Sequence, residues 1–228
     1  MRNEFDDNDL GAQELMPQLI NYCDYTYNLI FDQINNKDIL DFGSGFGDFC
    51  TFLNSKGLSA TAYEPNNIGY KQCISKKLNT YLDIKEIQTK YSVVTSICVL
   101  EHIEDDIKAL HQIKNLLIED GKLILFLPAS MIVWSQMDED VSHYRRYTNL
   151  EITKKLEQTG FKVESINYVD FIGWMVLFIF KLLRIKPKFN RKLTIFYDKL
   201  IFKHFKYLDV FFRKIIGKNI LVTASIIK

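Results

Sequence analysis

The chain has 228 residues, of which 47% are hydrophobic and 25% are charged, and its formal net charge is +1. This length is that of one large globular domain, and the composition excludes an extensively disordered chain. The small net charge conceals an asymmetry, because residues 181–218 carry a formal charge of +10 and the rest of the chain carries −9. The sequence therefore contains one specialised basic region.

Cysteine usage indicates a reducing compartment. No CxxC pair and no histidine at metal-ligand spacing occurs around the four cysteines, Cys23, Cys50, Cys73 and Cys98. We therefore expect no disulfide, no metal site and a cytoplasmic protein. The longest apolar stretch, residues 171–183, is interrupted by Lys181 and is shorter than the roughly 20 residues that a membrane-spanning helix needs.

The spacing of apolar residues predicts helices that alternate with strands. A leading helix spans 10–34, and a buried strand at 38–42 ends at a glycine-rich turn. The elements that follow are a helix at 48–55, a strand at 59–64, a helix at 66–77, strands at 80–84 and 91–100, a helix at 104–117, a strand at 121–127, a helix capped by Thr148 that runs to Gln158, a strand at 161–168, helices at 171–185 and 191–216, and a strand at 219–227.

This order predicts an α/β fold, a Rossmann-like doubly wound and mainly parallel seven-stranded sheet with helices on both faces and a helical insertion before the last strand. Residues 1–36 form an N-terminal helical segment. Residues 37–168 and 219–228 form the Rossmann-like domain, and the basic, aromatic residues 169–218 form the insertion.

The glycine-rich turn predicts a ligand site. Gly43 and Gly45 allow the backbone to turn tightly and to approach a ligand without a Cβ clash. The dinucleotide fingerprint G-x-G-x-x-G would place its third glycine where this chain has Asp48, and a carboxylate at a helix N-terminus repels a pyrophosphate. Glu64, at the end of the second strand, is placed to accept both hydroxyls of a ribose. A cofactor that has a ribose but no phosphates is therefore favoured over NAD.

Four segments resemble the successive motifs of class I S-adenosylmethionine-dependent methyltransferases, closest to the methyltransferase type 11/12 group: ILDFGSGFGDF, TAYEP, SVVTSICVLEHIEDD and LLIEDGKLILFLPAS. The resemblance covers about residues 10–168 and implies S-adenosyl-L-methionine as cofactor, with S-adenosyl-L-homocysteine as product. It assigns Val99 to the sulfonium region and Glu64 to the ribose. It also assigns Asp83 and Ile84 to the adenine, and the methionine part to Asp41, Gly43, Ser44 and Gly45.

Two histidines are candidates for catalysis. His102 follows the fourth strand, near the expected position of the cofactor's methyl group, and His143 lies in the loop after the fifth strand. A general base is needed there if the acceptor is a hydroxyl or a protonated amine. The alternative for His102 is a histidine that packs or caps the loop.

The HYRRYT segment at 143–148 resembles a loop of one subgroup of this family, whose members point to envelope sugar or lipid intermediates as acceptors. We expect Tyr144, Arg145 and Arg146 to contact the acceptor, the arginines through a carboxylate or a phosphate. The alternative is that the arginines pair with an acidic residue of the same loop and fix it, the candidates being Asp138, Glu139 and Asp140.

The basic insertion has three interpretations. Its second helix repeats apolar residues at roughly helical spacing and carries cations on a wetter side, a pattern typical of an anionic membrane surface, bound here through 171–216. The alternatives are a helical lid over the acceptor pocket and a homodimer interface. A nucleic-acid partner is not expected, because aliphatic residues separate the cations and no recognition module is evident.

The sequence thus predicts a methyltransferase that acts on a small-molecule acceptor or on a lipid- or sugar-linked one, with O-methylation preferred. It would work in the cytoplasm or peripherally at the inner face of the membrane. The alternatives are a non-catalytic S-adenosylmethionine-binding or membrane-recruited partner protein, and an NAD-dependent oxidoreductase.

Overall fold

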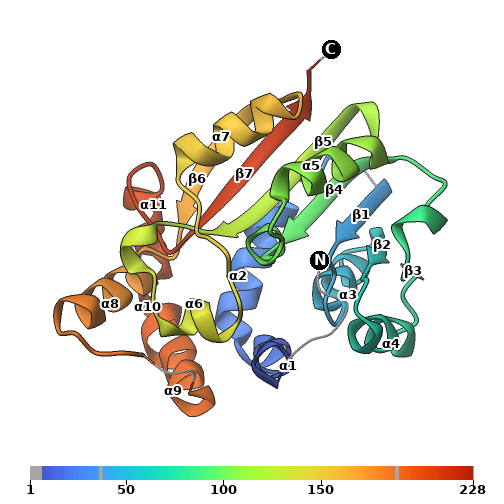
Figure 1. Cartoon of the computed structure of the whole chain (residues 1–228). Helices are drawn as coiled ribbons and strands as arrows, with labels where there is room; N and C mark the ends of the chain where they lie inside the picture. Colours follow the sequence, from blue (N-terminus) through green and yellow to red (C-terminus); the bar gives the residue numbers. More distant parts are fainter. Residues whose placement is uncertain (1–6, 36–37, 188–189, 228) are drawn as a thin grey trace.

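The computed structural model describes residues 7–35, 38–187 and 190–227, and its centre is a seven-stranded sheet (Figure 1). The strands are β1 (Asp38–Phe42), β2 (Ser59–Tyr63), β3 (Thr80–Tyr81), β4 (Tyr91–Ile97), β5 (Leu117–Pro128), β6 (Phe161–Val169) and β7 (Asn219–Ile226). Their order is β3-β2-β1-β4-β5-β7-β6. The first five are parallel, and β7 runs antiparallel to both β5 and β6, so the predicted fold class is confirmed.

Helices cover both faces of the sheet. They are α1 (Asp7–Leu15), α2 (Ile20–Phe31), α3 (Asp48–Ser55), α4 (Asn67–Ser75), α5 (Asp106–Leu116), α6 (Gln136–Asp140), α7 (Asn149–Gln158), α8 (Phe171–Leu182), α9 (Arg191–Phe196), α10 (Lys203–Phe205) and α11 (Asp209–Phe212). The other helical segments are the 3-10 turns η1 (Met16–Gln18), η2 (Ile84–Glu86), η3 (Leu100–His102), η4 (Met131–Val133) and η6 (Lys206–Leu208), and the π-helix η5 (Tyr197–Phe202).

The central strand β4 divides the core into two halves. Neighbouring side chains of a strand point to opposite faces, and both Val93 and Val94 are fully buried. Val94 belongs to the cluster that contains Leu110 of α5 and Ile152 of α7, whereas Val93 belongs to the cluster that contains Ile30 of α2. This burial on both faces explains why the strand reads as a continuous apolar run.

The leading helix is the first difference from the sequence prediction. Instead of one helix at 10–34, the chain forms α1, the 3-10 turn η1 and α2. Pro17 stands at the start of η1, and a proline has no N–H for the helical ladder and clashes with the preceding turn. The break places two helices beside the sheet. The predicted boundary at residues 36 and 37 lies outside the described residues.

Two strands differ in length from their predictions. The third strand ends at Tyr81 instead of residue 84, because the Asp83 side chain accepts a hydrogen bond from the Lys85 amide and caps η2. The fifth strand begins at Leu117 instead of Gly121, and a shift in its register with β4 between Tyr91 and Val93 accommodates the extra residues.

The predicted helix at 191–216 is interrupted, and buried aspartates lie along it. Asp198 accepts hydrogen bonds from the Asn21 and Tyr22 amides at the start of α2, and Asp209 accepts them from the Asp170 and Phe171 amides at the start of α8. These carboxylates satisfy helix N-terminal donors that would otherwise be unpaired. Asp198 therefore attaches the insertion to α2 by specific polar contacts, and Asp209 joins two parts of the insertion to each other.

Within 7–35, 38–187 and 190–227, no helix is both long enough and apolar enough to cross a bilayer.

Candidate active site

The glycine loop joins β1 to α3 at the carboxyl edge of the sheet, where the strand order reverses between β1 and β4. Gly43, Gly45 and Gly47 adopt φ values of +79°, +56° and +75°, a region that other residues enter only at a cost. The Gly43 and Ser44 amides donate hydrogen bonds to the Tyr63 carbonyl at 2.8 and 3.1 Å. The loop is thereby fixed to the end of β2.

Glu64 lies immediately after β2 and faces the glycine loop. It is 3% exposed, and its carboxylate accepts hydrogen bonds from the Gly45 amide at 2.6 Å and the Asn66 amide at 2.8 Å. Burial raises the pKa of Glu64 to about 7, against the opposing effect of those two amides. A buried carboxylate that still borders a cavity is suited to accept hydrogen bonds from ribose hydroxyls.

Asp41 is the buried carboxylate at the end of β1. Its oxygen accepts a hydrogen bond from the Thr95 hydroxyl of β4 at 2.8 Å. Burial raises the pKa of Asp41 to about 6, although the bonds from Thr95 and Cys50 oppose the shift. The side chain of Asp41 therefore joins β1 to β4 at the cavity wall.

Six of the eight residues predicted to hold the cofactor line a single cavity of about 260 Å³: Asp41, Gly43, Ser44, Gly45, Glu64 and Val99. The two predicted catalytic histidines, His102 and His143, line it as well. Its other lining residues include a third carboxylate, Asp48, and none of the lining residues is a lysine or arginine. An acidic cavity fits a cofactor with a sulfonium and an ammonium group better than one with a pyrophosphate.

Asp83 and Ile84 are the exceptions among the predicted cofactor residues. The Asp83 carboxylate caps η2, and the Ile84 side chain packs against the core. Neither lines the cavity. The sequence analysis predicted that the third strand includes both residues. Because β3 ends earlier, at Tyr81, they lie after the strand and away from the cavity.

Sequence reasoning missed the contribution of the N-terminal helices to the cavity wall. Ala12 and Gln13 of α1, Met16 of η1 and Tyr27 of α2 all line the cavity. A Cβ atom on Gly45 would lie 2.5 Å from the Gln13 side-chain oxygen, so α1 lies directly over the glycine loop. Pro17 was the sequence signal that could have indicated this arrangement. A proline interrupts the helix, and the change of direction there lets α1 lie over the cavity instead of continuing in line with α2.

His143 is held by the buried side chain of Asp138. Its Nδ1 atom lies 2.9 Å from Asp138, whose side chain also accepts a hydrogen bond from the Arg146 Nε atom at 2.7 Å. Burial acts to raise the pKa of Asp138, but the His143 bond and the Arg146 charge outweigh it and hold the pKa below its ordinary value. Asp138 therefore orients the imidazole and leaves Nε2 for the cavity side.

The remaining residues of the HYRRYT segment attach this loop to the scaffold. The Arg145 guanidinium donates to the Ile103 and Glu104 carbonyls and pairs with Asp106, and the Tyr147 hydroxyl donates to Asp106 at 2.9 Å. Arg146 bonds the Ala129 carbonyl as well as Asp138.

The acceptor contacts predicted for Tyr144, Arg145 and Arg146 stay a prediction, and the structure places these residues beside the cavity wall in the following way. None of the three lines the cavity, and both guanidinium groups are engaged in ion pairs. The alternative that the arginines fix the loop matches this geometry, with Asp138 as the partner of Arg146. The partner of Arg145 is Asp106 of α5, which the sequence analysis did not consider. Tyr144 is exposed, and its amide donates to the Glu101 carbonyl at 2.8 Å.

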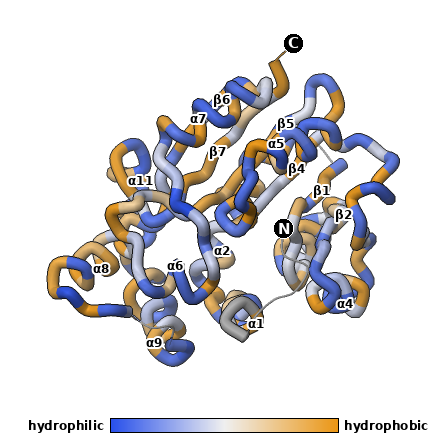
Figure 2. Tube along the Cα trace, viewed as in Figure 1, coloured by the Kyte–Doolittle hydropathy of each residue, from blue (hydrophilic) through white to orange (hydrophobic). Residues whose placement is uncertain are grey.

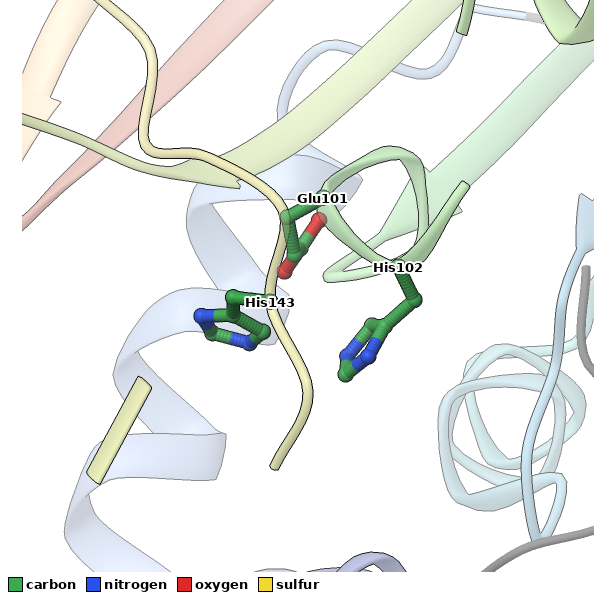
Figure 3. A group of neighbouring side chains, drawn as sticks. All are labelled: Glu101, His102 and His143. Carbon is green, nitrogen blue, oxygen red and sulfur yellow. The ribbon is translucent and has the colours of Figure 1, made fainter. Parts of the chain in front are cut away.

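The two histidines and Glu101 form one group of side chains (Figure 3). The imidazole rings of His102 and His143 meet edge to face, with their centroids 4.7 Å apart. Glu101 is fully buried, and its pKa is raised to about 7 by burial, against the opposing charges of His143 and Arg146. Sequence reasoning selected the histidines but not Glu101, because nothing in VLEHIEDD marks which acid points inward.

Comparisons with known proteins give the family. The sequence matches a family model described as a methyltransferase domain over residues 14–166. No curated protein sequence matches the chain.

The fold is similar to that of several solved structures. A methyltransferase of Haloferax volcanii in complex with the Trm112 methyltransferase activator has 13% identity and a TM-score of 0.65, with coverage of 97% of this chain and 96% of that chain. An S-adenosylmethionine-dependent methyltransferase of Archaeoglobus fulgidus has 15% identity and a TM-score of 0.63, with coverage of 96% and 100%. Magnesium protoporphyrin IX methyltransferase of Synechocystis PCC 6803, with bound S-adenosylmethionine, has 14% identity and a TM-score of 0.55, with coverage of 96% and 81%.

Proposed function

This chain belongs to the methyltransferase domain family and uses S-adenosylmethionine, and from that premise we propose that it methylates a hydroxyl oxygen of a lipid-linked acceptor at an anionic membrane surface. The observation that carries the reaction type is the pair of imidazoles, His102 and His143, on the wall of the acidic cavity. A methyl acceptor that is a hydroxyl must lose a proton, and imidazole is suited to assist that loss at neutral pH.

The cofactor has a defined orientation in this proposal. The glycine loop and Asp41 hold the methionine part, and Glu64 holds the ribose. Val99 and His102 then border the methyl group, since they follow the end of β4. The cofactor supplies an activated methyl group, and the protein supplies in-line orientation of the acceptor oxygen.

The acceptor oxygen approaches from the side of His143. Asp138 fixes this imidazole through the 2.9 Å contact at Nδ1, and the HYRRYT loop keeps it opposite His102. The acceptor O–H bond breaks as its proton passes to an imidazole nitrogen of this pair, and the oxygen forms a bond to the methyl carbon. The carbon–sulfur bond breaks, its electron pair stays on sulfur, and S-adenosylhomocysteine is the product.

The insertion supports a membrane-surface acceptor. Twelve of the 21 large hydrophobic residues that are exposed in the described ranges lie between Ile179 and Ile215, so exposed apolar surface is concentrated there. Nine exposed lysines and arginines share the same segment: Lys181, Arg184, Lys186, Arg191, Lys192, Lys199, Lys203, Arg213 and Lys214. Figure 2 shows α8 as a largely hydrophobic helix followed by hydrophilic residues. Apolar residues mixed with cations complement an anionic bilayer surface.

The test uses purified protein, methyl-labelled S-adenosylmethionine and an extract of the source cells that retains its membranes. After the reaction, the label is partitioned between organic and aqueous phases. The proposal expects label in the organic phase, a loss of that label in a His143→Asn variant, and no loss in a matched His111→Asn variant, whose histidine is exposed on α5. Label in the aqueous phase alone would overturn the lipid-linked acceptor. Cofactor binding without any transfer would favour the non-catalytic alternative.

A further inference from the structure

Glu101 has an unusual environment for a carboxylate. Its side chain is 0% exposed, and neither of its oxygens accepts a hydrogen bond from the residues that the structure describes. The Cys98 thiol is close enough to act as a weak donor, and the charges of His143 and Arg146 act on this carboxyl group, but the Arg146 guanidinium bonds Asp138 and the Ala129 carbonyl instead. A buried carboxylate without a strong hydrogen bond is unfavourable as an anion, so such a group either holds a proton or meets a cation.

Two imidazoles face this carboxylate. One nitrogen from each of His102 and His143 and one oxygen of Glu101 all lie within 4.8 Å of one another (Figure 3). Ligand atoms bound to one ion at about 2.0–2.2 Å lie at most roughly 4 Å apart, so modest side-chain rotations would bring this set together. A carboxylate with two imidazoles is a donor set typical of divalent transition metals such as Zn²⁺.

The surroundings of His143 match those of a metal ligand. Its Nδ1 atom contacts Asp138 at 2.9 Å, which leaves Nε2 as the donor toward Glu101 and His102. A metal-bound histidine almost always donates its second ring nitrogen to a carboxylate or carbonyl, which fixes the ring and makes the ligating nitrogen more basic. Asp138 is itself held by Arg146 at 2.7 Å, so this outer contact is rigid.

We propose that Glu101, His102 and His143 bind one divalent transition-metal ion at the edge of the cofactor cavity. Three protein ligands leave coordination positions open, as in catalytic zinc sites. An acceptor hydroxyl bound at such a position would lose its proton to water more readily, and this assignment of a role rests on the proposed function. The two histidines would then assist the reaction as metal ligands, whereas binding of the ion itself does not depend on the acceptor.

The test is a titration of the full-length protein, freed of metal by a chelator, with Co²⁺ as a spectroscopic probe. The expected result is a visible absorption band that saturates at one ion per chain and that Zn²⁺ abolishes by displacement, whereas Mg²⁺ does not. Glu101→Gln and His143→Asn should each weaken binding by more than tenfold. Asp138→Asn, which alters the outer contact of His143 and the pair with Arg146 but none of the three ligands, should weaken it by about 10–100-fold. His111→Asn should leave the titration unchanged.

Binding of S-adenosylhomocysteine shows whether a variant that has lost the metal site is still folded. The Glu101→Gln side chain has nearly the same shape and removes a buried charge, so the variant should bind S-adenosylhomocysteine as the wild type does. Absence of the band, or an equal affinity in Glu101→Gln and wild type, would overturn the metal site. Stoichiometric Co²⁺ binding without methyl transfer to any fraction would overturn the proposed function and leave the metal site intact.

Discussion

The two sides of the cavity are built in different ways. The cofactor side consists of consecutive residues at the ends of β1 and β2, and its key contacts are made by backbone amides of the glycine loop. The acceptor side is assembled from η3 and from the loop around His143, about forty residues apart in the sequence. Buried ion pairs, chiefly between Arg146 and Asp138, hold this second side in place.

This difference explains what each side contributes. Backbone amides and glycine turns leave little room for change, and under the proposed function they would recognise features that every S-adenosylmethionine molecule shares. Side chains in a loop attached by ion pairs can differ without disturbing the sheet. Under the proposed function, the sheet edge would hold the cofactor and the loop would select the acceptor.

The ion pair on the acceptor side gives the largest expected effect. Arg146→Ala would leave Asp138, which is 1% exposed, without its cationic partner. Breaking a buried pair in this way costs about 3–5 kcal/mol of unfolding free energy. Thermal and urea unfolding would measure it, and the double variant with Asp138→Asn should be less destabilised than the sum of the single variants. A loss below about 1 kcal/mol, within the range of an exposed pair, would contradict the account.

A substitution on the cofactor side should change the affinity for the cofactor more than the free energy of unfolding. Glu64→Gln keeps the shape of the side chain but removes the charge that accepts the ribose hydroxyls. Hydrogen bonds to charged groups contribute about 1.5–3 kcal/mol, so the affinity for S-adenosylhomocysteine should fall by that amount. Calorimetric titration measures this change. An unchanged affinity would remove Glu64 from the cofactor site.

The raised pKa of Glu64 predicts a pH dependence. The carboxylate must be ionised to accept both ribose hydroxyls, and its pKa is about 7, so the affinity for S-adenosylhomocysteine should fall by about tenfold between pH 8 and pH 6. Glu64→Gln should flatten this part of the profile. The folded state binds the Glu64 proton more tightly than the unfolded state does, because burial raises its pKa. The contribution of Glu64 to the unfolding free energy therefore falls as pH rises toward 7, whereas the affinity for S-adenosylhomocysteine rises. A profile that is flat in the wild type would contradict the prediction.

Removal of one cation from the insertion should give the smallest effect, a modest loss of binding to anionic vesicles. Lys203→Ser removes one exposed cation, and each cation near an anionic surface contributes about 1 kcal/mol. Sedimentation with phosphatidylcholine vesicles that contain phosphatidylglycerol would measure the loss. The matched control is Lys154→Ser, which removes an exposed cation of α7 outside the insertion. Equal losses in the two variants would indicate a general charge effect and contradict membrane docking through this segment.

The difference between the two sides of the cavity also explains which of their features could be predicted from the sequence. The turn at Gly43 and Gly45 was predictable because a tight strand-to-helix connection depends on short-range glycine spacing, and the position of Glu64 followed from its place at a strand end. The position of Asp83 was not predictable, because a single side-chain cap ended the third strand early. The burial of Glu101 and the pairing of Arg145 with Asp106 depend on where separate loops meet, which no local pattern encodes.

The central claim is that this cavity binds S-adenosylmethionine through the glycine loop, and calorimetric titration with S-adenosylhomocysteine and with NAD tests it directly. We predict one S-adenosylhomocysteine site per chain and no NAD binding. Gly45→Ala should lose much of the affinity, because φ is +56° there and the added Cβ meets the Gln13 side chain. Tight binding of NAD, or S-adenosylhomocysteine binding that Gly45→Ala leaves unchanged, would contradict the account.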